Sequence, residues 1–224
     1  GTTNPLLVAY SMKDRDLIRA LLNFGADPSL ADTKTNKNLT QLIYEDALQA
    51  SDEKSSMKQL LSDCFMQSIV QNDERALRQF VESGLEVNIR DESVVLPDQN
   101  TYLHWAALYA NESVARYLLD NGAEVNATNK YGATPLHECI AKRSIKDDKL
   151  KIIETLLVYK ADAIGVKGSS GIFKDLTAYE LAQSRHQSNL GSEAYLFIKE
   201  FLNETSSVPS TPMQPMSPLG KQHS

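Results

Sequence analysis

The most informative segment of the sequence is Asn100–Asn126, NTYLHWAALYANESVARYLLDNGAEVN. A second copy opens shortly after it as Gly132–His137, GATPLH, and the threonines Thr101 and Thr134 are 33 residues apart. Within each copy, apolar residues recur every three or four positions in two short segments, which is the spacing of amphipathic helices. A fixed period of this length indicates a repeat array in which each unit supplies one helix pair.

The ends of the predicted helices are marked by their residue types. Thr101 and Thr134 suit N-cap positions, because a threonine hydroxyl can accept a hydrogen bond from an N–H of the first turn. Pro135 comes just inside the helix, where its missing N–H costs nothing. Gly122 follows the second helix and suits a left-handed cap.

The T-P-L-H-x-A opening, the closing G-A-E-V-N and the period of 33 resemble the ankyrin repeat, and the resemblance covers most of residues 2–203. It implies an all-α fold, an ankyrin-repeat solenoid of about six stacked helix–turn–helix repeats with finger loops, some of them degenerate or carrying insertions. The predicted repeats are 2–33, 34–62, 63–96, 97–130, 131–170 and 171–203.

Four segments fit this pattern unevenly. Residues 38–62 lack the glycine ending, which leaves open whether the array is one stack or two stacks that meet there. The fifth repeat carries five extra residues near Arg143–Asp148. The Gly168–Gly171 stretch lacks the Lys-Ser/Thr end of a phosphate-binding loop, and we interpret it as a flexible loop. The finger Ile89–Gln99 carries Val94-Val95-Leu96, which either folds back or contacts a partner.

Composition restricts the classes of function. The 224 residues carry a formal net charge of −6, so a nucleic-acid backbone is not the expected partner. No run approaches the roughly 20 apolar residues that a membrane-spanning helix needs. The two cysteines, Cys64 and Cys139, form neither a disulfide framework nor a zinc pattern, which suits an intracellular protein of the cytoplasm or nucleus.

The residues that might carry chemistry are better explained as structural. His104 and His137 have no further metal ligands at suitable spacing, and the resemblance implies that they bond backbone groups of the adjacent repeat. Cys139 falls at a small core position, and Trp105 is interpreted as part of the core. We therefore expect no enzyme activity, no cofactor and no metal.

Binding remains as the expected activity. In the ankyrin family, partners usually meet the fingers and the inner helices, which together form a concave face, and exposed tyrosines are enriched at interfaces. The alternative is that these residues are ordinary exposed side chains. Lys130 and Lys142 beside Tyr109 and Tyr131 would suit a partner with an apolar anchor and an acidic flank. By position, the candidate partner-binding residues are Met12, Val70, Gln71, Leu108, Tyr109, Thr128, Lys130, Tyr131, Ala133, Lys142 and Arg185.

These observations predict a monomeric, non-catalytic protein-interaction module, an adaptor or scaffold for a protein or linear peptide ligand. The alternatives are a regulatory ankyrin domain of a transcription cofactor, or one belonging to a multidomain enzyme whose catalytic part lies outside this sequence.

Residues 204–224 differ from the array. Four prolines, from Pro209 to Pro218, recur every three residues, which is the period of the polyproline II helix. We expect either a flexible tail or a binding segment that could dock on this array. Thr211 and Ser217 each precede a proline and are candidate phosphorylation sites.

Overall fold

The computed structural model describes residues 4–47, 52–89, 98–142, 147–188 and 192–207. These residues contain eleven α-helices and one 3₁₀ turn, and apart from two isolated bridges they form no β-structure. The fold is therefore all-α, as predicted. The helices are α1 (Pro5–Ser11), α2 (Arg15–Asn23), α3 (Leu39–Ala47), α4 (Asp52–Gln71), α5 (Glu74–Glu82), α6 (Tyr102–Tyr109), α7 (Glu112–Asp120), α8 (Pro135–Ala141), α9 (Asp147–Val158), α10 (Ala178–Gln187) and α11 (Ser192–Ser207), with the 3₁₀ turn η1 at Gly171–Phe173.

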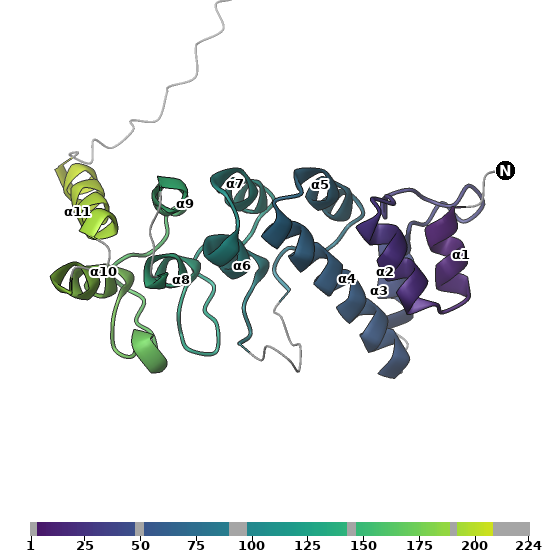
Figure 1. The fold of residues 1–224 in the computed structure, drawn as a ribbon, viewed down its shortest axis with the longest axis horizontal. Coiled ribbons are helices and arrows are strands. Elements are labelled where there is room, and N and C mark those ends of the chain that lie inside the picture. Colours follow the sequence, from purple (N-terminus) through teal and green to yellow (C-terminus); the bar gives the residue numbers. More distant parts are fainter. Residues whose placement is uncertain (1–3, 48–51, 90–97, 143–146, 189–191, 208–224) are drawn as a thin grey trace, which may run out of the picture.

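The helices stack in two rows (Figure 1). One row contains α6, α8 and α10, and the other contains α5, α7, α9 and α11. Helices of the same row contact one another, as α6 contacts α8 and α7 contacts α9. The loops that precede α8 and α10 extend to the same side of the stack, which gives the predicted fingers.

The predicted signals begin and end these helices. Thr134 Oγ1 accepts a hydrogen bond from the backbone N–H of His137 at 3.4 Å, and Thr177 makes the same contact with Glu180 at 3.2 Å. At the other end of a helix pair, Gly122 has φ +86°, a conformation that favours glycine because it has no Cβ.

The array has one continuous core. A single cluster of buried side chains begins at Leu6 in α1, includes Leu39 and Ile43 in α3, and reaches Ile198 in α11. One helix pair cannot bury its own apolar face, so each pair depends on its neighbours. The described residues thus form one stack, which answers the question that residues 38–62 left open.

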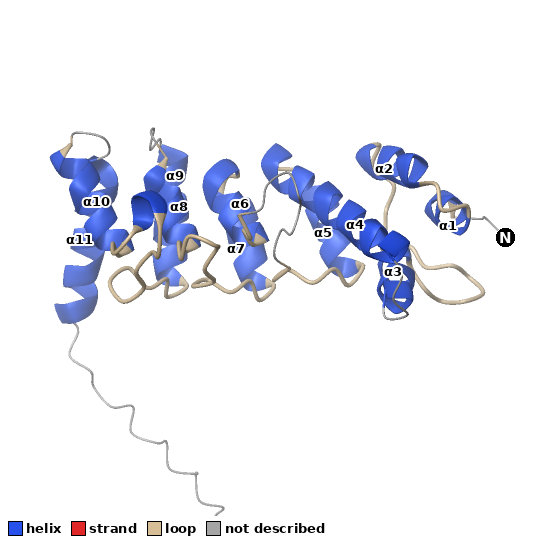
Figure 2. Ribbon diagram, turned by 90° about the horizontal axis from the view of Figure 1, so that it is seen from below, coloured by secondary structure: helices blue, strands red, loops and turns tan. Residues whose placement is uncertain are grey.

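Helix α4 corrects one predicted boundary. The division between the second and third repeats at residues 62 and 63 falls inside this 20-residue helix. The segment 52–71 contains neither glycine nor proline, so nothing in it stops the helix. It contacts α2 and α3 on one side and α5 and α6 on the other, so the two repeats share one helix (Figure 2).

Two further expectations change at the C-terminal end. Helix α11 continues to Ser207, and Thr205 Oγ1 donates to the carbonyl of Phe201 at 3.0 Å, so residues 204–207 belong to the array and not to the tail. The tail from residue 208 onward, with Thr211 and Ser217, lies outside the described residues. The same holds for residues 90–97 of the third finger and for residues 143–146 of the insertion.

The Gly168–Gly171 stretch is not the flexible loop that its composition suggested. Gly168 donates to the carbonyl of Leu176 and accepts from Asp175, both at 3.0 Å. Phe173 is buried beside it, and a Cβ added at Gly168 would lie 2.4 Å from the Phe173 backbone oxygen. Glycine is therefore required here because two backbone segments approach closely.

Candidate functional site: the inner face of the array

The inner face is formed by the C-terminal ends of α4, α6, α8 and α10. Gln71 and Tyr109 are the last residues of α4 and α6, Lys142 is the C-cap of α8, and Arg185 lies in the last turn of α10. Each of these helices packs beside the next one in the row. Four of the predicted binding residues thus occupy equivalent positions on neighbouring helices.

The most developed part of this face is an aromatic–cationic cluster of Trp105, Tyr109 and Lys142. The Tyr109 side chain is 47% exposed and stacks on Trp105, with ring centroids 5.5 Å apart and an interplanar angle of 23°. Lys142 Nζ lies 4.2 Å from the centroid of the Tyr109 ring, which is a cation–π geometry. We call these three residues the Tyr109 cluster.

Trp105 is the base of this cluster. It is only 8% exposed, which confirms its interpretation as a core residue. Its indole Nε1 is buried and has no hydrogen-bond partner among the described residues. The indole is therefore held by packing alone, and the Tyr109 ring stacks on this buried indole. Sequence reasoning did not join Trp105 to Tyr109, although their spacing of four residues on one helix was the available signal.

Arg185 has a structural contact on this face. Its Nη2 donates to the backbone carbonyl of Lys142 at 2.8 Å, at the C-terminal end of α8. Lys149 makes a similar contact at the C-terminal end of α6, where its Nζ donates to the carbonyl of Ala107 at 2.8 Å. Cations at helix C-termini satisfy carbonyls that have no intrahelical partner. Both residues thus join neighbouring repeats, and the role of Lys149 was not predicted.

The finger before α8 is held by ion pairing within the array. Lys130 Nζ lies 2.7 Å from Asp98 Oδ1, and the Tyr131 hydroxyl donates to the same carboxylate oxygen at 3.0 Å. The bond from Lys130 lowers the pKa of Asp98 below its usual value. Since Lys130 is paired with Asp98 and Lys142 lies over an exposed tyrosine, Lys142 is the more available cation.

Tyr131, in the finger before α8, packs against the next finger, which precedes α10. Its backbone carbonyl accepts a hydrogen bond from Ser169 at 2.7 Å, and its ring lies 6.5 Å from that of Phe173. The prediction that Ala133 binds a partner is wrong, because its side chain is completely buried. Of the other candidates, Met12, Val70 and Gln71 are exposed, whereas Leu108 and Thr128 are half-buried.

The two histidines connect repeats, as the resemblance implied. His104 Nε2 donates to the carbonyl of Ala133 at 2.9 Å, and His137 Nε2 donates to the carbonyl of Leu176 at 3.1 Å. Each Nδ1 accepts from the backbone N–H of the threonine that opens its own helix, Thr101 or Thr134. Burial lowers the pKa of His137 below its usual value, which favours the neutral ring.

The cysteines are unsuited to nucleophilic chemistry. Burial raises the pKa of the Cys64 thiol to about 11 and that of Cys139 to about 12, so both stay protonated near neutral pH. Over the described ranges, no group of three or more His, Cys, Asp or Glu side chains could hold a metal ion. Nor does any helix of the described chain have the length and apolar character needed to cross a membrane.

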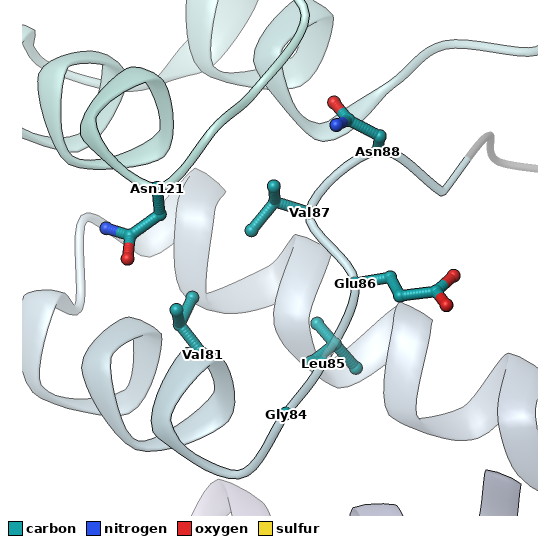
Figure 3. A pocket seen from close by; sticks show the side chains of 7 residues that line it. All are labelled: Val81, Gly84, Leu85, Glu86, Val87, Asn88 and Asn121. Atoms are coloured by element: carbon teal, nitrogen blue, oxygen red, sulfur yellow. The ribbon is translucent and has the colours of Figure 1, made fainter.

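A depression of about 480 Å³ lies elsewhere, between the C-terminal end of α5 and the residue that follows α7 (Figure 3). Val81, Leu85 and Val87 line it together with Asn88 and Asn121. Asn88 joins the two adjacent repeats there, because its Nδ2 donates to the carbonyl of Gly122 and its Oδ1 accepts from Glu124, both at 2.9 Å. The depression is therefore a junction between two repeats, and Glu86 is the one ionisable group among the residues that line it.

Comparison with known families agrees with this geometry. The family model for ankyrin repeats (three copies) matches residues 65–166, which include the Tyr109 cluster and both linking histidines. The matched segment consists of ankyrin repeats. Ankyrin repeats generally mediate protein–protein interaction. The helix pairs on either side of the matched region, α1–α2 and α10–α11, continue the same stack and the same core.

Similar proteins have diverse activities. An ankyrin repeat protein of Fowlpox virus is 28% identical over 80% of this chain, which covers 43% of the viral protein. The transcription factor SWI6 of Pyricularia oryzae is 29% identical over 53% of this chain and 12% of its own length. The palmitoyltransferase Hip14 of Drosophila melanogaster is 44% identical over 27% of this chain and 9% of its own length. The chain thus spans less than half of each of these relatives.

Proposed function

We propose that this ankyrin array is a non-catalytic adaptor or scaffold module that binds a protein or peptide partner on its inner face. The observation that carries the proposal is the Tyr109 cluster. It offers an aromatic ring that is exposed on one side, supported from below by Trp105 and flanked by Lys142. Rigid aromatic side chains next to a cation are typical of residues that dominate binding energy at interfaces.

The partner would supply two kinds of group. An apolar side chain would pack on the exposed side of Tyr109, and a nearby carboxylate would pair with Lys142. The second cation that the sequence suggested, Lys130, is paired with Asp98, so it contributes less to an acidic partner. We therefore place the centre of the binding face at α6 and α8 and not at the finger tip.

A second candidate function is regulation of another domain. A transcription factor and a palmitoyltransferase are among the similar proteins, and in both the similarity covers a small part of the whole. In this alternative the inner face would bind a segment of the same full-length protein. The residues involved would be the same, and only the source of the ligand would differ.

The test is a selection of peptides from a displayed random library on the immobilised chain, followed by measurement of their affinities for variants. Tyr109→Ala and Lys142→Glu should each weaken the selected peptides by at least ~10-fold, since residues central to an interface each contribute more than ~1.4 kcal/mol. Ile172→Ala is the matched control, because Ile172 is also an exposed apolar side chain but lies in the 3₁₀ turn of another finger. Equal loss in the control, or no loss in the two variants, would refute the proposal.

A further inference from the structure

The aromatic ring of Tyr109 has a neighbour on each of its two faces. Trp105 stacks on the ring, with centroids 5.5 Å apart and an interplanar angle of 23°. Lys142 Nζ lies over the same ring, 4.2 Å from its centroid. Non-bonded heavy atoms need about 3.5–4.0 Å between them, so two rings at this separation leave no room for an ammonium group. The Lys142 ammonium therefore lies over the face of the Tyr109 ring that the indole does not cover.

This open face is the one that a partner would use. Tyr109 is 47% exposed, so a ligand can reach its ring from solvent. The centre of the open face, however, is occupied by the ammonium group of Lys142. An apolar side chain of a partner and the Lys142 ammonium thus compete for the same position on the ring.

The side chain of Lys142 can leave that position. Its main chain is fixed, because the carbonyl of Lys142 accepts a hydrogen bond from Arg185 Nη2 at 2.8 Å. Its side chain has a flexible four-carbon stem, and among the side chains that the structure describes it forms no ion pair. Glu138, one turn earlier on α8, is instead hydrogen-bonded by Asn129 Nδ2 at 2.8 Å. The Tyr109 ring is therefore the group that holds the ammonium in place.

Two classes of partner would meet this arrangement differently. A partner with only apolar groups must break the cation–π contact and return the ammonium to water, which opposes binding. A partner that also carries a carboxylate offers the ammonium a charge-assisted hydrogen bond in exchange. Recognition of the apolar group and recognition of the carboxylate are then coupled through one side chain.

We propose that Lys142 is a specificity-determining residue of the inner face, which covers the Tyr109 ring until a carboxylate of the partner draws the ammonium away. The inference rests on the proposed function, because it concerns the same site. It names the partner class more narrowly, as an extended segment whose acidic residue lies within about three residues of its apolar one. That spacing follows because α6 and α8 are neighbours, helix axes in contact lie about 8–10 Å apart, and an extended chain advances about 3.3 Å per residue.

The test is to measure the affinities of two peptides by fluorescence anisotropy at constant ionic strength. One is a library-selected peptide with a carboxylate near its apolar residue, and the other is the same peptide with each Asp and Glu replaced by Asn and Gln. Lys142→Met and Lys142→Gln should each weaken the acidic peptide by at least ~10-fold. The same variants should strengthen the neutral peptide by about two- to five-fold, because no cation–π contact then has to be broken.

A purely structural role of Lys142 would not produce effects of opposite sign on the two peptides. Lys199→Met is the matched control, since Lys199 Nζ lies over the Tyr195 ring on α11 at 5.8 Å, and it should change neither affinity. Losses for both peptides, or no change for either, would overturn the inference. If Tyr109→Ala also leaves both affinities unchanged, the proposed function fails as well; if Tyr109→Ala weakens both peptides, only the role of Lys142 is refuted.

Proton chemical shifts test the covered ring directly. Protons above the face of an aromatic ring resonate upfield, so the ε-methylene of Lys142 should be shifted upfield in the free chain relative to the Tyr109→Leu variant. Saturation of the wild-type chain with the acidic peptide should remove this upfield shift. Equal ε-methylene shifts in wild type and Tyr109→Leu, or an upfield shift that persists at saturation, would contradict the displacement of Lys142 from the ring.

Discussion

Replacing His104 by alanine tests how the repeats are joined. The change removes the bond from Nε2 to the Ala133 carbonyl at 2.9 Å, and the bond from the Thr101 backbone N–H to Nδ1 at 3.1 Å. The ring is completely buried, so water does not replace either partner without local opening. The Thr101 N–H is then left buried without a partner, whereas the Ala133 carbonyl keeps only its bond from the Asn129 backbone N–H at 2.9 Å.

The magnitude follows from the loss of these two hydrogen bonds. A buried donor or acceptor left without a partner costs about 1–3 kcal/mol. One such group, the lost second bond to the Ala133 carbonyl and the space left by the ring, reduced by local relaxation, together give a loss of about 2–4 kcal/mol in the free energy of unfolding. Native domains are stabilised by only about 5–15 kcal/mol, so this is a large part of the total.

The assay is urea unfolding followed by circular dichroism, with the midpoint and slope fitted for wild type and variant. Gln67→Ala is the matched control, because Gln67 is exposed on α4 and its removal should change stability by less than about 0.5 kcal/mol. A loss below about 1 kcal/mol for His104→Ala would show that the histidine does not join the repeats in solution.

Three further outcomes are expected. Leu118→Ala should reduce the free energy of unfolding by about 2–5 kcal/mol, because Leu118 is completely buried; a change below about 1 kcal/mol in the same urea assay would mean that it is not a core residue. Because burial lowers the pKa of His137 below 6.5, the unfolded chain takes up the proton first as the pH falls, so stability is full above about pH 6.5 and decreases below it. Melting curves between about pH 7.5 and 5.5 should show a smaller decrease for His137→Gln than for wild type, and equal decreases would contradict this assignment. Removal of residues 208–224 should leave the melting temperature unchanged, because the buried residues of α11, Ala194 and Ile198, precede the cut; a clear decrease would show that the tail stabilises the array.

The sequence was sufficient to predict the fold because its signals are local. The 33-residue period, the capping threonines and the glycines that follow the second helices each depend on a few neighbouring residues. Where such signals are missing, the boundaries were wrong. Asp63 was aligned as the start of a repeat, but no helix-breaking residue precedes it, so α4 continues through that position.

The candidate site was predictable in outline only. Its residues were chosen by register, which correctly placed Tyr109 at an exposed position of α6 but could not show what each side chain contacts. Ala133 is part of the buried core, and the histidine of the preceding repeat bonds to its carbonyl. Arg185 is drawn to the end of α8, and Lys130 is paired with Asp98. Such contacts join residues about 30–45 positions apart, and no pattern within a single repeat encodes them.

The most direct measurement of the central claim is the indole N–H resonance of Trp105 in a ¹H–¹⁵N spectrum. Trp105 is the sole tryptophan of the chain and lies directly against Tyr109, so one signal reports on the proposed site. Titration with a library-selected peptide should shift this resonance in the wild type and in Ile172→Ala, and the same peptide concentrations should leave it unshifted in Tyr109→Ala. An unchanged indole resonance in a wild-type chain that is saturated with peptide would contradict binding at the Tyr109 cluster.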